Sequence, residues 1–108
     1  MTTYTIVNMT PHAITVVGHD PIPPSGDVAR VSVTDTPAGY IADYPVSVQE
    51  TGTVEGLPGP KHGVYYIVSS LVRLALPDRN DLLSPGQLVR DDEGRPVGCR
   101  TLTRNGGV

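Results

Sequence analysis

Turn-forming residues set singly between short apolar runs constrain the fold of this chain more than any other feature. The 108 residues include 12 Gly and 11 Pro, which are spread along the chain rather than gathered in one tail. Turn signals recur about every eight to twelve residues, which is the spacing of small sandwiches and barrels. We therefore expect a single domain over 1–108 that is mainly β. It would be a small sandwich or partly open barrel of about seven to eight short strands, with one short α-helix.

The expected strands follow runs of β-branched and aromatic residues. The first two are predicted to pair as a hairpin with His12 near its tip. A second hairpin turn is predicted at 91–94, with Gly94 placed for a positive φ. Residues 35–39 indicate a turn region, and 104–108 a flexible tail. The expected strands are 4–7, 13–17, 28–33, 44–49, 52–57, 63–68, one that ends at Arg90, and 95–102.

The stretch 63–90 is expected to form the centre of the fold. Residues 63–68 hold the longest run of large β-forming residues and predict a central strand. Ser69 and Ser70 follow, then an apolar run, which predicts a helix N-cap and one to two helical turns that end at Pro77. A strand that runs into a serine-capped helix presents free backbone N–H groups, which suit a bound anion.

The net charge of −3 argues against a binder of duplex nucleic acid. The charge is distributed unevenly. Residues 1–54 contain five acids and one base, whereas residues 55–108 contain six acids and seven bases, of which six are Arg. Arginine presents a planar fork that suits phosphate groups and stacking on bases. A codon bias toward Arg would give the same composition, so that alternative stays open.

Composition also bounds the core and the chemistry. The chain has no Trp and no Phe, so its core is small and a homo-oligomer is expected to complete the burial. Cys99 is the single cysteine, and the three histidines lack the spacing of metal ligands, so we expect no metal and no cofactor. Because the sequence shows neither a signal peptide nor a membrane-spanning stretch, we expect a cytoplasmic protein with no membrane partner.

Polar side chains from distant segments are candidates for one anion-binding cleft. Arginine side chains would hold phosphate groups, while Ser69 and Ser70 would add hydroxyl and amide donors. Tyr65 or Tyr66 would stack on a base, and the turn 8–12 would bind a base edge. The candidate ligand-binding residues are Asn8, Thr10, His12, Arg30, Tyr66, Ser69, Ser70, Arg79, Asp81 and Arg90.

Each of these features also has a purely structural interpretation. The two serines would serve as an N-cap. The loop 78–81 would be a self-contained turn closed by an Asp–Arg pair, instead of a loop in which Asp81 orients Arg79 toward a ligand. The histidine turns would be solvated or would cap backbone groups. The sequence leaves both interpretations open.

Short motifs are spread over most of the chain. They are Asn8-x-Thr10-Pro11-His12, 22–26 followed by Ala29-Arg30, 55–58, Tyr66-Ile67-Val68-Ser69-x-Leu71-Val72, Pro77-Asp78-Arg79-x-Asp81 and 88–91 followed by Gly94. Together they resemble a family of small uncharacterised proteins of phages and prophages, common in actinobacterial viruses. By size, origin and Arg/Ser/Tyr content, and not by motif, the chain is also similar to phage anti-defence sponges. Those are small oligomeric proteins that sequester cyclic nucleotide or cyclic ADP-ribose signals of bacterial immunity.

The sequence leads to one expected function and two alternatives. The first, implied by the sponge analogy, is a phage-encoded anti-defence protein that binds and sequesters a cyclic dinucleotide such as cyclic GMP-AMP in the host cytoplasm. The second is a metal-independent cyclic nucleotide phosphodiesterase with His12 and another histidine as its acid–base pair. The third is a structural virion component, which suits the β-rich, aromatic-poor composition. We expect a binding protein rather than an enzyme.

Overall fold

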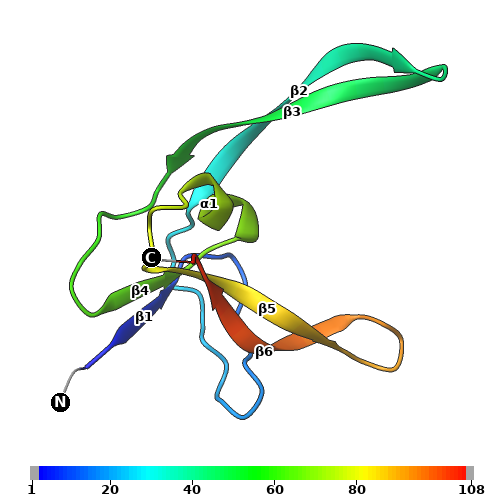
Figure 1. Cartoon of the computed structure of the whole chain (residues 1–108). Helices are drawn as coiled ribbons and strands as arrows, with labels where there is room; N and C mark the ends of the chain where they lie inside the picture. The colour runs from blue at the N-terminus through cyan, green and yellow to red at the C-terminus, as the bar shows by residue number, and fades with distance from the viewer. Residues whose placement is uncertain (1–2, 107–108) are drawn as a thin grey trace.

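The computed structural model describes residues 3–106 and is mainly β with one short helix, as predicted (Figure 1). Its strands form two sheets, one of four strands and one of two. Over the described residues neither sheet closes into a barrel. The elements are β1 (Thr5–Asn8), β2 (Arg30–Ile41), β3 (Tyr44–Glu55), β4 (Val64–Ile67), α1 (Ser70–Ala75), β5 (Leu82–Arg90) and β6 (Pro96–Arg104).

The four-stranded sheet has the order β1-β4-β5-β6. Strands β1 and β5 both run parallel to β4, and β6 is antiparallel to β5. The predicted central strand is confirmed, because β4 lies between two neighbours and ends in buried residues. The predicted helix is confirmed as well. Ser69 is its N-cap, and the Ser69 Oγ accepts a hydrogen bond from the Val72 N–H at 3.3 Å. Pro77 follows the last turn, where it cannot continue the helix.

One face of the four-stranded sheet packs on α1 and forms the core. Tyr66 and Leu82 are paired in register on this face, and both are buried with Val72 of the helix. Met9 and Ala29, from the chain that precedes β2, complete the cluster. The core is made mainly of aliphatic side chains, which agrees with the small core expected from a sequence without Trp or Phe.

The opposite face of the same sheet is only partly covered. Ile6 pairs in register with Tyr65, and Leu83 with Arg104, so these four side chains lie on one side of the sheet. The loop between β1 and β2 covers the end of this face nearest Asn8. We call the uncovered part, defined by Tyr4 and these four residues, the open face. Both Tyr4 and Ile6 are exposed there.

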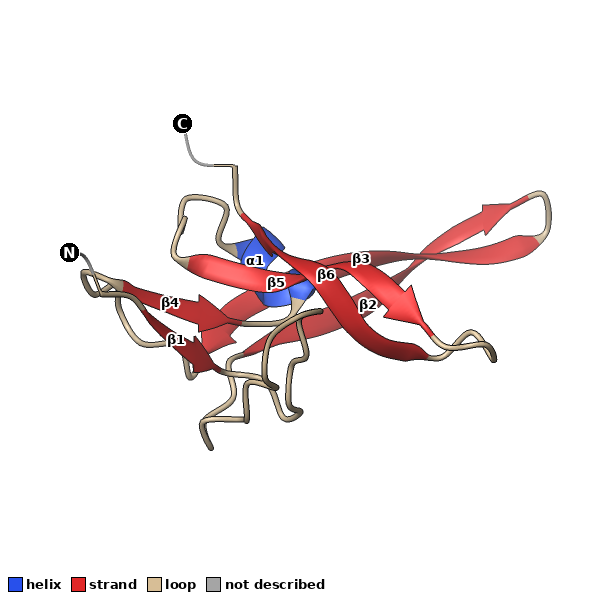
Figure 2. Cartoon of the chain, turned by 90° about the horizontal axis from the view of Figure 1, so that it is seen from below, coloured by secondary structure: helices blue, strands red, loops and turns tan. Residues whose placement is uncertain are grey.

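Strands β2 and β3 form a long hairpin that projects from the rest of the molecule (Figures 1 and 2). We call this segment, residues 30–55, the arm. The largest extent of the molecule is 59 Å, and its radius of gyration is 16.6 Å, against about 13 Å expected for a compact chain of this length. Val31 and Val54, at the base of the arm, are its only residues packed against the core cluster among the described residues. The arm beyond its base is therefore solvent-exposed.

The arm corrects two predictions. The turn expected at 35–39 is wrong, since those residues belong to β2, and the strands expected at 44–49 and 52–57 are one strand, β3. Both strands of a two-stranded sheet are edges, so they tolerate Pro37 and a register irregularity at Gly39 that a central strand would not. The chain reverses instead at Ala42 and Asp43, where two successive positive φ angles match a type I′ turn.

The predicted hairpin of 4–7 with 13–17 is also wrong. Strand β1 pairs with β4, and 13–17 contributes only two isolated bridges, Ile14 with Ile22 and Val16 with Cys99. The β-branched residues of this stretch satisfy their hydrogen bonds across the loop and against β6. Non-local pairing has therefore overridden the local strand signal.

The C-terminal hairpin is confirmed, with Gly94 at a φ of 81° in its turn. Asp91 accepts hydrogen bonds from the N–H groups of Glu93 and Arg95, both at 2.9 Å, which fixes the turn. The tail expected over 104–108 is wrong at its first two residues. Arg104 closes β6 and Asn105 is buried, while 107–108 lie outside the described residues.

Candidate functional site

In the turn from Asn8 to His12, the polar side chains form hydrogen bonds mainly within the turn itself. Asn8 is 1% exposed, and its Nδ2 donates to the carbonyl oxygens of His12 at 2.8 Å and Ile22 at 2.9 Å. Its Oδ1 accepts from the N–H and the Oγ1 of Thr10, at 3.0 and 2.6 Å. The side chain of Asn8 therefore has no free donor for a base edge, and it holds the loop that covers the sheet.

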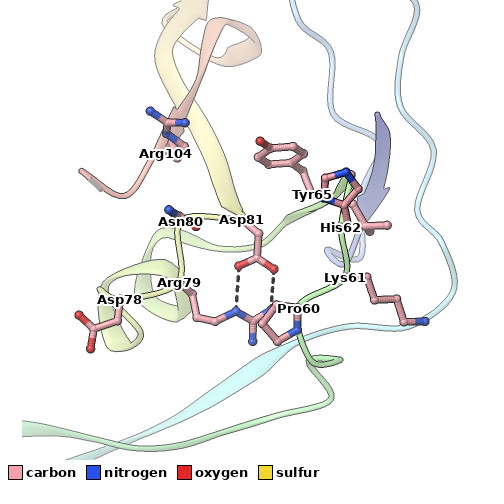
Figure 3. Close-up of a pocket in the computed structure, with 11 residues that line it drawn as sticks. Pro60, Lys61, His62, Tyr65, Asp78, Arg79, Asn80, Asp81 and Arg104 are labelled. Atoms are coloured by element: carbon pink, nitrogen blue, oxygen red, sulfur yellow. Dashed lines mark hydrogen bonds and ion pairs between the residues drawn. The ribbon is translucent and has the colours of Figure 1, made fainter. Parts of the chain in front are cut away.

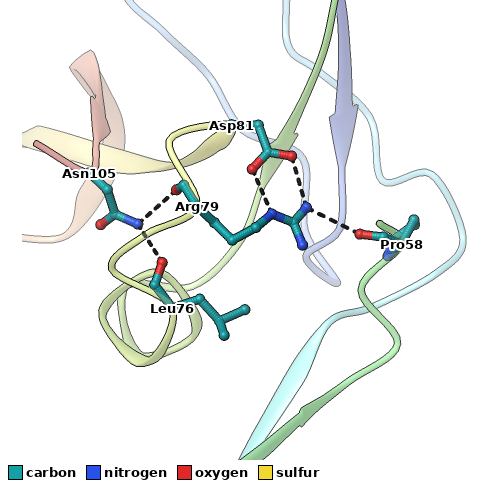
Figure 4. A network of polar contacts seen from close by, with 5 residues as sticks. All are labelled: Pro58, Leu76, Arg79, Asp81 and Asn105. Carbon is teal, nitrogen blue, oxygen red and sulfur yellow. Dashed lines mark hydrogen bonds and ion pairs between the residues drawn. The ribbon is translucent and has the colours of Figure 1, made fainter. Parts of the chain in front are cut away.

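Arg79 and Asp81 form a two-pronged ion pair. The Nε and Nη2 atoms of Arg79 each lie 2.8 Å from a carboxylate oxygen of Asp81, and Nη2 also donates to the carbonyl oxygen of Pro58 at 3.1 Å (Figure 4). The hydrogen bonds between the two side chains lower the pKa of Asp81 and raise the pKa of Arg79, in each case against the opposing effect of burial. The arrangement matches the self-contained Asp–Arg turn, one of the two interpretations left open by the sequence.

The remaining predicted residues lie in separate places. Arg90 donates to the carbonyl oxygen of Gly94 at 2.9 Å, at the far end of the β5–β6 hairpin. Tyr66 is 3% exposed in the core. Arg30 and Ser69 do come together, since both line a hollow of about 420 Å³ beside the base of the arm. Ser70 begins α1 and is exposed. The structure thus does not gather the predicted residues into one cleft.

A second hollow, of about 380 Å³, lies between the 60–65 segment and the 78–81 loop (Figure 3). Its lining includes Lys61, His62, Tyr65, the Arg79–Asp81 pair and Arg104. In Figure 3 the Tyr65 ring lies next to His62, and Arg104 lies on the other side of the ring. Asp78 and Lys61 point outward. Because Asp81 neutralises Arg79, the cationic character of this hollow comes from Lys61 and Arg104, and Asp78 is the remaining acid in its lining.

The open face adjoins this hollow and shares Tyr65 and Arg104 with it. Tyr4, Ile6, Tyr65, Leu83 and Arg104 line a further hollow of about 380 Å³. The Tyr4 and Tyr65 rings are 5.7 Å apart at 59°, a tilted aromatic pair. Among residues 3–106, Arg104 takes part in none of the ion pairs, which all involve Arg79 or Arg95. The open face is thus an apolar surface bordered by an uncompensated cation.

The tip of the arm is the most exposed apolar feature of the described chain. Tyr40, Tyr44 and Ile41 are 77%, 73% and 68% exposed. Tyr40 pairs with Pro45 and Ile41 with Tyr44, and consecutive pairs point to opposite sides, so both faces of the tip are apolar. Exposed clusters of this kind mark interaction surfaces.

The arm is also acidic. Residues 30–55 contain one base, Arg30, and four acids, which gives a net charge of −3, whereas residues 56–108 carry seven bases and five acids. The sequence indicated an acidic N-terminal half but did not predict the arm, because the turn-forming residues at 35–39 were interpreted as a turn between two strands. The signal that could have revealed the tip is its cluster of apolar residues, Tyr40, Ile41 and Tyr44, around two turn residues.

Comparison with known proteins found no matching family model, no matching curated protein and no matching solved structure. The resemblance to small phage proteins therefore remains a prediction. Residues 3–106 contain no helix long and apolar enough to cross a membrane.

Proposed function

We propose that this chain is a structural, self-assembling protein that uses its arm to bind a second copy of itself. Of the three functions considered from the sequence, this corresponds to the structural virion component. The single observation that supports it most is the arm, twelve residues in each strand, with an apolar tip and nothing packed against it beyond its base in the described chain.

The physical argument begins with stability. An isolated two-stranded hairpin is at best marginally stable in water. The two arm strands present unpaired backbone groups on both outer edges, which makes them templates for pairing with another chain. A partner that covers the tip and an edge would stabilise the arm and bury the three large apolar side chains at once.

Charge favours a second copy as that partner. The arm carries a net charge of −3 and the C-terminal half of the same chain is positive, so two copies have complementary surfaces. Arm-to-arm contact would bring two acidic segments together and is disfavoured. An arm bound to the body of a neighbouring copy satisfies both the apolar and the electrostatic requirement.

The test is the mass of the particle in solution by size-exclusion chromatography with light scattering. We expect wild type at a multiple of the 11.4 kDa chain mass. A variant with Tyr40→Ser, Ile41→Ser and Tyr44→Ser should run as a monomer, while Ser47→Ala with Gln49→Ala, on the same arm, should keep the wild-type mass. A monomeric wild type at every concentration, or a tip variant that still assembles, would refute the proposal.

A second function, sequestration of a small phosphorylated ligand such as a cyclic dinucleotide, is supported by the hollow beside Tyr65. Its lining includes Tyr65, which pairs with Tyr4 of the adjoining open face, and Lys61 and Arg104, which take part in none of the ion pairs of the described residues; this combination suits a base and a phosphate. A panel of cyclic nucleotides in a thermal-shift assay tests it. A true ligand at a hundredfold excess over its dissociation constant adds about 2.7 kcal/mol of stability. This gain should vanish in Arg104→Ala, and a panel without any stabilising member contradicts the idea.

A further inference from the structure

We infer that the tip of the arm of one copy binds the open face of another copy, with Asp43 of the arm next to Arg104. This inference rests on the proposed self-assembly and names the surface that receives the arm. That surface consists of Tyr4, Ile6, Tyr65, Leu83 and Arg104.

The two surfaces match in chemistry. The tip offers aromatic and aliphatic side chains on both faces of the hairpin, and Asp43 lies in its turn. The open face offers an aromatic pair, two aliphatic side chains and an arginine outside every ion pair of the described residues. Contact would bury exposed apolar area on both sides and place a carboxylate near an uncompensated guanidinium.

The arm of a given copy does not reach its own open face. In Figures 1 and 2 the tip of the arm and the strands β1 and β4 lie at opposite ends of the molecule. The arm is also directed outward over most of its length, in agreement with the 59 Å extent. The contact is therefore between copies.

Other exposed apolar residues of the body are less suitable receptors. Leu88 and Val97 lie on the β5–β6 hairpin, whose turn segment 90–95 has three acids and two bases; Arg95 pairs with Asp91 and Glu93, and the remaining net charge of −1 does not attract an acidic arm. Leu71, on α1, lines a hollow in which Arg30 already has Glu55 opposite it in register, so no cation there is left without a nearby acid. The open face is instead lined by one cation, Arg104, and by no acid among the described residues.

Photo-crosslinking tests the contact directly. A chain with p-benzoylphenylalanine in place of Tyr44 is assembled with wild-type chains and irradiated, and the crosslinked peptides are identified by mass spectrometry. We expect crosslinks to peptides that contain residues 4–6, 65, 83 or 104 of the neighbouring copy. Assembled particles whose crosslinks fall elsewhere would overturn this inference and leave the proposed self-assembly intact. A wild type that remains monomeric would overturn both.

Charge reversal gives an independent test, because both side chains are exposed. Asp43 has a φ of 69°, so Asp43→Asn, which removes the charge and keeps a residue that tolerates this conformation, is measured beside Asp43→Arg and should also weaken assembly. Arg104→Asp and Asp43→Arg should each weaken assembly about tenfold or more, and their combination should recover most of the loss. Lys61→Asp alone, a matched reversal at the border of the surface, should have a smaller effect. If neither reversal at 43 or 104 changes the assembly constant, the pairing of these two residues is refuted.

Discussion

Replacement of Asn105 is predicted to destabilise the protein far more than its place near the C-terminus suggests. Asn105 is 5% exposed, and its Nδ2 lies 2.9 to 3.1 Å from three carbonyl oxygens, those of Arg73, Leu76 and Arg79. Its Oδ1 accepts from Arg73 Nη1 at 3.0 Å. One amide thus bonds carbonyl groups at the end of α1 and in the loop that follows it (Figure 4). The carbonyl groups of Arg73 and Leu76 also accept a backbone N–H, so the carbonyl of Arg79 is the one that depends on Asn105.

The magnitude follows from these contacts. An intramolecular hydrogen bond makes a net contribution of about 1 kcal/mol to the free energy of unfolding. A buried partner left without a hydrogen bond lowers that free energy by about 1–3 kcal/mol. Two N–H groups are shared by three acceptors, so Asn105→Ala is expected to lose about 3–4 kcal/mol of the free energy of unfolding. At about 4 °C or more per kcal/mol for a domain of this size, the melting temperature should fall by roughly 15 °C.

Urea denaturation and thermal melts monitored by circular dichroism measure this loss. Asn105→Asp is the sharper variant, because it keeps an oxygen for Arg73 but replaces both N–H donors with an oxygen that faces three carbonyl groups. It should be at least as destabilised as the alanine variant. Asn80→Ala, at an exposed site on the same loop, is the control and should be nearly neutral. If Asn105→Ala resembles Asn80→Ala, or if Asn105→Asp retains wild-type stability, the reasoning is wrong.

Three further predictions concern the stability of the body. Gly56→Ala should cost about 2 kcal/mol or more in urea denaturation, because Gly56 has a φ of 81° and a Cβ there would lie 2.6 Å from the carbonyl oxygen of Val28; Gly59→Ala, in open space, should be neutral. Ser69→Ala should lose about 1 kcal/mol as the N-cap is removed, while Ser70→Ala should lose little, and equal losses would refute the capping role. The lowered pKa of Asp81 means that its contribution is complete above the unfolded value of 3.8 and is lost as pH falls through the lower folded value. Acid titrations of stability should therefore show a shallower loss below pH 3.8 in Asp81→Asn than in wild type, and parallel curves would contradict the assignment.

The parts of the fold that the sequence predicted correctly are those set by local chemistry. The strand at 63–68 has a continuous run of β-forming residues, Ser69 is placed to cap the following helix, and Gly94 supplies the positive φ that its hairpin turn needs. Each of these signals acts within a few residues. These signals can therefore be interpreted without knowledge of the tertiary structure.

The parts that were missed depend on residues far apart in the sequence. The pairing of β1 with β4 joins positions about sixty residues apart, and the carbonyl acceptors of Asn105 lie 26 to 32 residues away. The arm was missed for a different reason. Pro37 and Gly39 are turn-forming residues that an edge strand tolerates, and whether a strand lies at an edge is a property of the whole sheet.

The candidate site shows the same division. The self-contained turn of Arg79 and Asp81 was one of the two interpretations of the 78–81 loop, because the two residues are close in sequence. The open face could not be predicted, since Tyr4, Tyr65 and Arg104 are brought together only by the pairing of all four strands of the sheet.

The claim that the arm is covered by another copy is tested most directly by hydrogen–deuterium exchange of residues 30–37, which lie away from the tip. The comparison is between wild type and the variant with Tyr40→Ser, Ile41→Ser and Tyr44→Ser, and peptides from β5 serve as the internal reference. We predict slow exchange of 30–37 in wild type and rapid exchange in the variant, with β5 unchanged. The same exchange of 30–37 in both proteins would contradict the claim that the arm is held by a neighbour.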